Sequence, residues 1–437
     1  MPRTSVIQGT GFIRRPMFGS RENARVSIEY DGTVFQLSND RLTKHILAIG
    51  APGFGKTVAL LQIAEQLRAT ASANDVFVFF DTKGDYQERL RRAGDSVISY
   101  GADANAVWNI YSDLLADGDS EDDLYDNAYE ISSMLFYDKL QNSPNPFFPN
   151  AARDLLMGLL FSFALQGKED SRYRANHLNN KALAAFLRTR FTPENIAQEL
   201  RQYDATKGIV TAFSAGEQSG QMNPQSQGVI SEAATVGREV FKGCFAGNGD
   251  FSLREFIRHR GGKALFIEYD LYRGNTLLPI YRTLCDLILK EALARNANRQ
   301  GRVYVFMDEL RLLPDLQYLE NAVNFGRGMG VTIIAGLQAV SQVQQTYGEY
   351  GARSILDNFG TAIMFNTSDP STREVIAGRI GKNVRLESYS TAHGRMEERE
   401  RISNVIEDWD ISKLGIGDAI IHSIGSEPYT FHFPDRS

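Results

Sequence analysis

The chain has 437 residues, 43% of them apolar and 23% charged, with a formal net charge of −6 at pH 7. These values are ordinary for a folded globular protein, and they exclude a disordered, collagen-like or coiled-coil chain. The length allows two or three domains, or one large domain with an insertion. The excess of acidic residues gives no general support for nucleic-acid binding, which would need a local basic surface.

Two features concern the cellular compartment. The cysteines, Cys244 and Cys285, form no CxxC pair, so we expect neither a disulfide framework nor a structural zinc site, and we expect a reducing compartment. The longest apolar stretch without a charge, 155–167, has 13 residues. A membrane-spanning helix needs about 20. The N-terminus shows no apolar signal segment. The sequence as given therefore predicts a cytoplasmic protein.

The N-terminal part of the chain alternates strands with a helix. Alternating apolar and polar residues on either side of Asp31-Gly32 predict a β-hairpin. A short apolar strand then leads into a glycine-rich turn and an amphipathic helix, and a second, wholly apolar strand is typical of the interior of a parallel sheet. The ranges are Arg25–Tyr30 and Thr33–Leu37 for the hairpin, His45–Ile49 and Val76–Phe80 for the strands, and Val58–Ala69 for the helix.

The middle of the chain predicts helices only. It begins with an acidic segment, 113–126, and has a flexible polar segment, Ser214–Gly228, near its end. Apolar residues at helical spacing mark Leu124–Leu135, Ala151–Leu165, Asn180–Arg190 and Pro193–Gln202.

Strands return in the C-terminal part, at Ala264–Tyr269, Val303–Met307, Val331–Ala335, Thr361–Asn366 and Ala419–Ser423. We therefore predict an α/β protein with a mainly parallel sheet, interrupted by an all-α insertion. The predicted boundaries are 1–110 for the hairpin and the first part of the α/β domain, 111–250 for the insertion, and 251–437 for the remainder.

The strongest motif is a complete G-x4-G-K-T sequence between the first apolar strand and the amphipathic helix. In such a phosphate-binding loop, glycines let backbone N–H groups surround a phosphate at the N-terminus of the helix. Lys56 would reach the β- and γ-phosphates, and the Thr57 hydroxyl would bind Mg²⁺. The residues predicted to bind the nucleotide are Gly50, Ala51, Pro52, Gly53, Phe54, Gly55, Lys56, Thr57 and Val58.

The partner motif is an apolar strand, Val303–Met307, that ends in two adjacent carboxylates. Asp308 would hold Mg²⁺, and Glu309 would orient or deprotonate the attacking water, because phosphoryl transfer depends on positioning and charge stabilisation. Two acids after a strand can also be an ordinary helix start. The phosphate loop favours the catalytic interpretation, and the second acid favours hydrolysis.

Three further segments follow predicted strands or lie close to them. Gln338 comes after the strand Val331–Ala335 and could contact the γ-phosphate, or be a simple loop residue. Arg327, between a helix and that strand, could be an arginine finger for a neighbouring subunit or a solvated turn residue. Asp81–Asp85 follows another strand on the side where open α/β sheets bind ligands. Ser214–Gln218 faintly resembles an ABC-transporter signature, but it lies too far before Asp308 to serve as one.

Taken in order, these segments resemble the type IV coupling proteins of bacterial conjugation and type IV secretion, the VirD4/TraG/TraD group, and more broadly the hexameric FtsK/HerA-like DNA translocases. The segments that carry the resemblance are His45–Thr57, Asp81–Asp85, Pro146–Arg153, Phe251–Phe256, Asp308–Leu310, Gly326–Gly328, Gly336–Gln342, Tyr347-Gly348 and Ile355–Asn358.

The resemblance implies a RecA-like P-loop NTPase with an inserted all-α domain, assembled as a homo-hexamer with ATP and Mg²⁺ at the subunit interfaces. It implies that Arg327 acts as the trans-acting finger and that Gln338 senses the γ-phosphate. The implied partners are DNA, which we expect to be single-stranded and bound without regard to sequence, a relaxase, and a type IV secretion channel. Family members usually carry N-terminal transmembrane helices; this chain has none, so we expect membrane attachment only through a segment absent from it.

The leading hypothesis is therefore an ATPase motor that moves relaxase-bound DNA into a secretion channel. The alternatives are a nucleotide-switched docking platform for relaxase or effector proteins, and a soluble DNA translocase unconnected with secretion. Four basic clusters could supply local charge for DNA, although each is by default a solvated helix face. They are Arg89/Arg91/Arg92, Arg172/Arg174, Arg254/Arg258/Arg260/Lys263 and Arg295/Arg299/Arg302. The acidic segment 113–126 should lie away from DNA.

Overall fold

The computed structural model describes residues 3–13, 24–101, 103–214, 224–294, 301–313, 315–390 and 396–435. The chain forms two compact units. The sheet unit comprises Met1–Ala93, Gly261–Ala264 and Ala292–Ser437, and the helical unit comprises Gly94–Arg260 and Leu265–Glu291. The boundaries predicted at 110 and 250 lie near these limits and stay a prediction. In the described parts of both units, no helix is long and apolar enough to cross a membrane.

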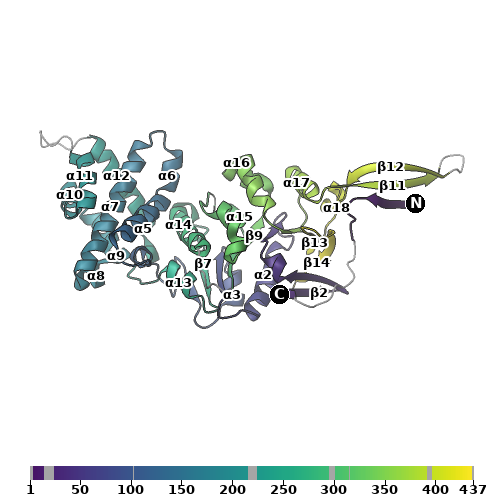
Figure 1. The fold of residues 1–437 in the computed structure, drawn as a ribbon, viewed down its shortest axis with the longest axis horizontal. Helices are drawn as coiled ribbons and strands as arrows, with labels where there is room; N and C mark the ends of the chain where they lie inside the picture. The colour runs from purple at the N-terminus through teal and green to yellow at the C-terminus, as the bar shows by residue number, and fades with distance from the viewer. Residues whose placement is uncertain are drawn as a thin grey trace. The chain divides into compact units, whose positions relative to one another are not determined.

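The sheet unit is built on a mainly parallel sheet with the strand order β14-β13-β10-β4-β9-β8-β5 (Figure 1). The five strands from β10 to β5 run parallel, whereas β13 and β14 add an antiparallel hairpin at one edge. The strands are β4 (Ile46–Ile49), β5 (Val76–Asp81), β8 (Val303–Met307), β9 (Val331–Leu337), β10 (Thr361–Met364), β13 (Asp418–Ser423) and β14 (Tyr429–His432). The parallel strands are buried throughout, as their continuous apolar runs predicted.

Helices connect and cover these strands. The longest are α2 (Lys56–Ala69), α15 (Leu319–Met329), α16 (Val340–Asp357) and α17 (Pro370–Ile380); the short ones are α1 (Asn39–Leu42), α3 (Asp85–Leu90), η3 (Leu310–Leu312) and α18 (Asp408–Ser412). Helix α2 packs against β4 and β9, and α15 packs against β9. The sheet carries the phosphate loop directly between β4 and α2, which is the predicted order.

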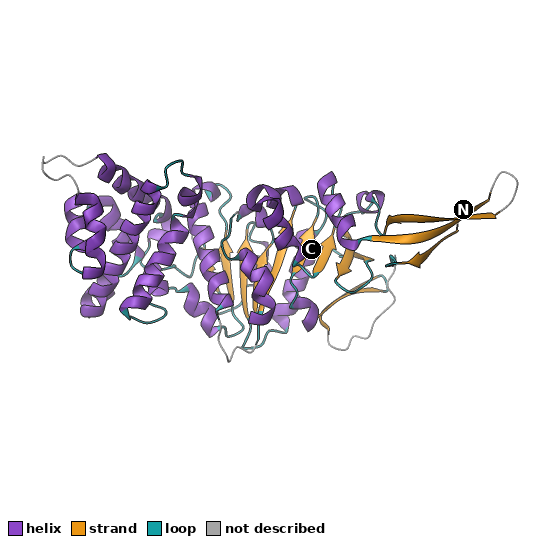
Figure 2. Cartoon of the chain, turned by 45° about the horizontal axis from the view of Figure 1, so that its top comes forward, coloured by secondary structure: helices purple, strands orange, loops and turns teal. Residues whose placement is uncertain are grey.

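Two smaller sheets complete the sheet unit (Figure 2). The predicted hairpin is confirmed as β2 (Ala24–Tyr30) and β3 (Thr33–Ser38), with Asp31 and Gly32 at positive φ in its turn. A second sheet, β1 (Arg3–Gln8), β11 (Lys382–Ser390) and β12 (Met396–Asn404), was not predicted. Its strand β12 is rich in charged residues and has no apolar alternation, and most of its side chains face solvent.

The helical unit surrounds one long buried helix, α7 (Phe147–Glu169), which contacts α5, α8, α10, α11 and α12. The other helices are α4 (Ile110–Leu114), α5 (Glu121–Leu135), α6 (Tyr137–Asn142), α8 (Ser171–His177), α9 (Asn180–Thr189), α10 (Pro193–Leu200), α11 (Asp204–Ser214), α12 (Pro224–Val240), η2 (Gly243–Ala246), α13 (Leu253–His259) and α14 (Gly274–Leu293). Two strands, β6 (Ser96–Ile98) and β7 (Ala264–Glu268), pair in parallel; β6 was not predicted. The helical middle of the chain is confirmed.

The flexible segment expected at Ser214–Gly228 is only partly described. Ser214 ends α11, and residues 224–228 begin α12, so the expectation of flexibility is wrong for 224–228. Residues 215–223, with most of the segment that resembles an ABC-transporter signature, lie outside the described residues.

The basic cluster that begins at Arg254 is not a solvated helix face. The Arg254 side chain is 4% exposed, and its guanidinium lies 2.7 Å from a carboxylate oxygen of Asp117 and 2.8 Å from one of Glu130. Arg258 contacts the same Asp117 and also Glu291. The expectation of a solvent-facing cluster is therefore wrong for Arg254, which neutralises part of the acidic segment inside the helical unit.

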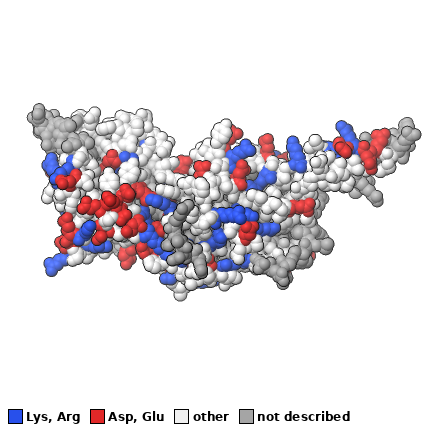
Figure 3. Space-filling view, viewed as in Figure 1, with Lys and Arg blue, Asp and Glu red and all other residues white. Residues whose placement is uncertain are grey.

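The acidic segment itself divides into an inner and an outer part. Asp113 is fully buried and accepts hydrogen bonds from the Trp108 indole, the Ser252 hydroxyl and the Arg254 backbone. Burial raises the pKa of Asp113, and these donors oppose the shift. The outer acids, Asp119, Glu121, Asp122, Asp123 and Asp126, are exposed. Figure 3 shows Asp and Glu side chains gathered on the helical unit.

Replacing Arg254 should destabilise the protein. Arg254→Ala would remove the buried cation that contacts Asp117 and Glu130. Arg258 and Lys290 still pair with these carboxylates, so we expect the loss of hydrogen bonds to a charged group, about 1.5–3 kcal/mol. We expect the helical unit to unfold at a lower urea concentration, measured as the midpoint of the loss of helical circular dichroism. Arg172→Ala, which removes an exposed arginine of α8, is the matched control and should change the midpoint little. Equal midpoints for the two variants would contradict the assignment.

Candidate nucleotide-binding site

The phosphate loop has the backbone that its glycines predict. Gly53 and Gly55 have φ values of 81° and 104°, a region that side chains disfavour. Gly50, the first residue after β4, is also required for space: a Cβ atom there would lie 2.7 Å from Cβ of Phe365. The loop then opens directly into α2, so backbone N–H groups at the start of this helix face the loop.

The Lys56 ammonium group rests on the loop itself. Its Nζ donates hydrogen bonds to the carbonyl oxygens of Gly50, at 2.6 Å, and Ala51, at 2.9 Å. Burial lowers the pKa of Lys56, and the nearby carboxylates of Glu309 and Asp308 oppose this shift. The charge is therefore held over the loop, where an anionic ligand would meet it.

The two acids after β8 each have a partner from a different element. The Thr57 hydroxyl lies 2.7 Å from Oδ2 of Asp308, and Gln338 donates from Nε2 to Oε2 of Glu309 at 2.6 Å. Burial raises the pKa of Asp308 to about 6, although Thr57 and Lys56 favour its charged form. The second oxygen of each acid, Oδ1 of Asp308 and Oε1 of Glu309, is buried and has no hydrogen-bond partner among the described residues. Two such oxygens are suited to bind a cation or a water molecule.

These residues line one cavity of about 510 Å³. Of the nine loop residues predicted to bind nucleotide, Pro52, Gly53, Gly55, Lys56, Thr57 and Val58 line it, as do Asp308, Glu309 and Gln338. Gly50, Ala51 and Phe54 do not line it, but the carbonyls of the first two hold Lys56. Thr82 and Lys83, from the segment Asp81–Asp85, also reach the cavity. The structure thus brings the predicted strand-end residues together.

The opposite wall of the cavity was missed by the sequence analysis. It is formed by Ile416, Gly417, His432, Phe433 and Asp435, from the C-terminal hairpin and its flanks. The Gly417 backbone N–H donates to the Phe54 carbonyl at 3.1 Å, which joins this wall to the phosphate loop. No local motif marks these residues, because their position depends on pairing between β10 and β13.

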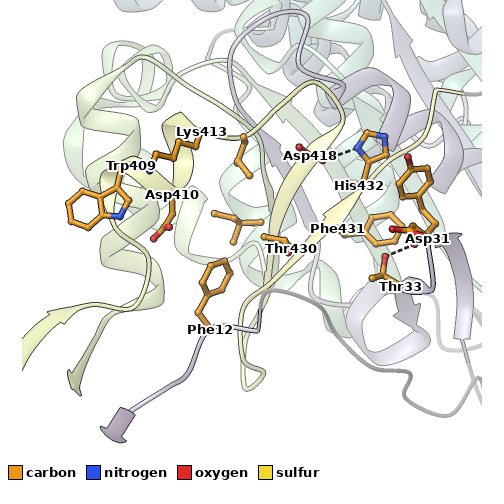
Figure 4. Close-up of a pocket in the computed structure, with 13 residues that line it drawn as sticks. Phe12, Asp31, Thr33, Trp409, Asp410, Lys413, Asp418, Thr430, Phe431 and His432 are labelled. Carbon is orange, nitrogen blue, oxygen red and sulfur yellow. Dashed lines mark hydrogen bonds and ion pairs between the residues drawn. The ribbon is translucent and has the colours of Figure 1, made fainter. Parts of the chain in front are cut away.

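The His432 side chain also borders a neighbouring pocket of about 560 Å³ (Figure 4). Its Nδ1 lies 2.8 Å from Oδ1 of Asp418, and its ring lies against Tyr30, with 4.3 Å between the ring centres. Tyr30 belongs to the N-terminal hairpin. The histidine therefore connects this hairpin with the wall of the nucleotide cavity.

Arg327 does not line the cavity. It lies in the last turn of α15, not in a turn between helix and strand, because the helix continues to Met329 and ends at Gly330 in the left-handed conformation. Its side chain is 60% exposed and lies 3.4 Å from Asp40, which is equally exposed. Such an exposed pair contributes little to stability, so the arginine can be released from Asp40 at small cost.

Gly336 is a further residue that the site requires. It lies in β9 beside the end of β8, and a Cβ atom at this position would be 1.9 Å from the Asp308 carbonyl oxygen. Only glycine lets the two strands approach closely enough to hold Asp308 against Thr57. The sequence showed Gly336 as part of a segment that resembles the family, without this role.

The fold and the site together define a RecA-like P-loop NTPase, as predicted. The sequence model described as the type IV secretion-system coupling protein DNA-binding domain matches residues 31–408. The chain therefore belongs to the family of type IV coupling proteins.

Individual relatives agree with this family. The chain is 26% identical to the conjugal transfer protein TraG of Rhizobium radiobacter over 305 residues, which are 67% of this chain and 46% of TraG. It is 24% identical to the coupling protein VirD4 of Bartonella henselae over 62% of this chain and 42% of VirD4. It is 28% identical to the coupling protein TraD of Escherichia coli over 36% of this chain and 23% of TraD. The matches thus span less than half the length of these relatives.

The solved structures show the same fold. The plasmid coupling protein TrwB in complex with ADP and Mg²⁺ superposes with a TM-score of 0.73 at 20% identity, covering 99% of this chain and 95% of that one. A sulphate complex of a TrwB variant gives a TM-score of 0.74, also at 20% identity, with the same coverage. A VirB4 structure from Thermoanaerobacter pseudethanolicus is more distant, with a TM-score of 0.56 at 15% identity over 96% of this chain and 98% of that one.

Gly336→Ala should weaken nucleotide binding without unfolding the protein. The added methyl group would displace the Asp308 backbone, and with it the carboxylate that we expect to hold Mg²⁺ beside the phosphates. We expect Gly336→Ala to bind a fluorescent ATP analogue more weakly than the parent when Mg²⁺ is present. Gly378→Ala, in α17, meets nothing within 4 Å and should bind like the parent. Unchanged binding by Gly336→Ala would show that Asp308 needs no close approach of β9.

Proposed function

We propose that this chain is the ATP-hydrolysing motor of a type IV coupling protein, and that it moves relaxase-bound DNA toward a secretion channel. The observation that carries the proposal is the pairing of Thr57 with Asp308 and of Gln338 with Glu309 beside the phosphate loop. Family membership supports the coupling role, and TrwB, with the same fold, is known in complex with ADP and Mg²⁺ and with an ATP analogue.

The residues would divide the work of hydrolysis as follows. Lys56 would exchange its two carbonyl partners for the β- and γ-phosphates, because phosphate oxygens are the stronger acceptors of its charge. Thr57 and Asp308 would hold Mg²⁺, which neutralises negative charge on the phosphates when bound. The free oxygens of Asp308 and Glu309 fit these roles.

Glu309 would orient the attacking water and accept its proton through Oε1, which has no other partner among the described residues. Gln338 holds the other oxygen of the same carboxylate at 2.6 Å, so the orientation of Glu309 is fixed before ligand arrives. We infer that Gln338 senses the γ-phosphate through this contact: a shift of its amide toward the phosphate would release Glu309.

The remaining parts of the proposal concern assembly. Arg327 is exposed and does not line the nucleotide cavity of its own chain. It therefore suits an arginine finger that enters the nucleotide site of a neighbouring subunit in a homo-hexamer. Single-stranded DNA, a relaxase and the type IV secretion apparatus at the cytoplasmic face of the cell membrane are the partners that the family suggests. A ring of this kind would bind DNA through local charge and stacking, without base readout.

Glu309→Gln should separate binding from hydrolysis. Loss of a general base typically costs about 10²–10⁴ in rate, whereas the amide keeps the size of the side chain. We expect near-normal binding of a fluorescent ATP analogue and almost no phosphate release. Lys56→Ala should lose both, since it removes the charge that meets the phosphates. Normal phosphate release by either variant would refute the catalytic assignment.

Arg327→Ala should abolish hydrolysis only if the protein works as a ring. Loss of an arginine finger costs about 10³–10⁵ in kcat. Mixing Arg327→Ala with Lys56→Ala subunits should restore part of the phosphate release, because a wild-type arginine then meets a wild-type lysine across some interfaces. Arg353→Ala, which removes another exposed arginine, should keep full activity. Failure of rescue in mixed rings of proven composition would contradict the trans role.

A further inference from the structure

The turn between β7 and α14 (Figure 1) carries the most exposed aromatic side chain among the described residues of the helical unit. Tyr272 is 91% exposed in this turn, and the adjacent Leu271 is 64% exposed. Single apolar side chains on a protein surface are common, so exposure alone does not mark Tyr272 as a binding residue. The surroundings of Tyr272 indicate what kind of ligand it fits.

Tyr272 is part of a stack. The Arg273 guanidinium lies over the Tyr272 ring, 5.4 Å from its centre, and over the Tyr100 ring, 4.6 Å from its centre. The same cation therefore contacts the faces of two aromatic rings. Since Arg273 covers one face of Tyr272 and the side chain is almost wholly exposed, the other face of the ring is open to solvent.

The stack is held in place by its own turn. Oδ2 of Asp270 accepts a hydrogen bond from the Arg273 guanidinium at 2.8 Å. Oδ1 of Asp270 accepts hydrogen bonds from the backbone N–H groups of Tyr272, at 2.9 Å, and Arg273, at 3.0 Å. The Asp270 backbone N–H in turn donates to the Tyr281 hydroxyl at 3.1 Å. These bonds fix the turn in one conformation, so little conformational entropy remains to be lost on binding.

Two glycines show that the base of the stack is tightly packed. A Cβ atom on Gly243 would lie 2.3 Å from the Tyr100 ring, and one on Gly274 would lie 2.2 Å from the Tyr269 hydroxyl. Tyr269 packs in turn on Tyr281, with 4.9 Å between their ring centres. The residues beside Tyr272 in the stack and its turn are therefore tightly packed against other aromatic side chains.

We propose that Tyr272, Arg273 and Tyr100 form a stacking platform for single-stranded DNA, in which a nucleobase packs on the open face of Tyr272. The proposal rests on the proposed function and adds the place where the DNA is held. Every base has a π-face, so such a platform binds any sequence, which a translocating motor requires. Because the Arg273 guanidinium is paired with Asp270, positive charge near the platform comes from Lys242, whose ammonium lies 3.3 Å from the Thr276 carbonyl at the start of α14.

A protein partner would use this turn differently. An apolar protein contact would bury Leu271 along with Tyr272, because the two exposed side chains are adjacent. Base stacking needs the flat ring of Tyr272 and gains little from the aliphatic side chain of Leu271. The two side chains therefore distinguish DNA from protein, and Leu271→Ser is the matched control.

The test measures binding of a short fluorescein-labelled oligothymidylate to the full chain by fluorescence anisotropy. Loss of one base–aromatic stack should weaken binding of Tyr272→Ala by about 5- to 100-fold. Tyr272→Phe and Tyr272→Trp should bind at least as tightly as the parent, since both keep a ring, and Leu271→Ser should change affinity little. The slope of log Kd against log salt should stay the same in Tyr272→Ala, because no phosphate contact is lost. ATP hydrolysis measured without DNA should be unaffected.

The outcomes separate the platform from the motor. If the parent binds the oligonucleotide and Tyr272→Ala binds it equally well, the platform is refuted and the proposed function stands. Equal losses in Leu271→Ser and Tyr272→Ala would refute stacking and favour an apolar protein contact. A parent chain that binds no DNA at all would refute both. Photocross-linking of a bromodeoxyuridine-substituted oligonucleotide to Tyr272, located by mass spectrometry, would support direct contact, and cross-links confined to other segments would overturn it.

Discussion

The hydrogen bond between Thr57 and Asp308 is the contact on which the nucleotide site depends. It joins the first turn of α2 to the carboxyl end of β8, two elements that are 251 positions apart in the chain. It can form only because β4, β9 and β8 run parallel and in register, which places their carboxyl ends at one edge. The same alignment brings Gln338, after β9, to Glu309. One sheet geometry therefore supplies both the proposed cation site and the proposed catalytic carboxylate.

Much of this arrangement could be predicted from the sequence, because it depends on residues that are close together in the chain. The phosphate loop is contiguous, and Asp308, Glu309 and Gln338 each follow an apolar run that marks a parallel strand. The residues that were missed depend on contacts between distant segments. Gly336 is required only because the end of β8 passes beside it, and His432 and Phe433 reach the cavity only through the pairing of β13 with β10. Arg327 was expected between a helix and a strand, whereas α15 continues through both flanking glycines to Met329.

Charge was the least predictable property. Arg254 lies on a helix among other basic residues, a pattern typical of a solvated face, yet it is buried against Asp117 and Glu130. The −6 net charge of the chain is thus not spread evenly over its surface. Part of the acidic segment is buried or paired with arginine inside the helical unit, while the acidic residues of Asp119–Asp126 are exposed. A sequence alone cannot distinguish these two groups, because only tertiary packing determines which carboxylates meet an arginine.

The nucleotide cavity takes one wall from residues 52–58 and the other from residues 416–435. During synthesis the phosphate loop leaves the ribosome long before its second wall exists, and closing the cavity requires contacts across almost the whole chain. Partly made chains would thus expose a phosphate loop that lacks the C-terminal side of its pocket. Retention of nucleotide by the whole cavity therefore requires a completed sheet unit, so bound nucleotide would report that this unit has finished folding.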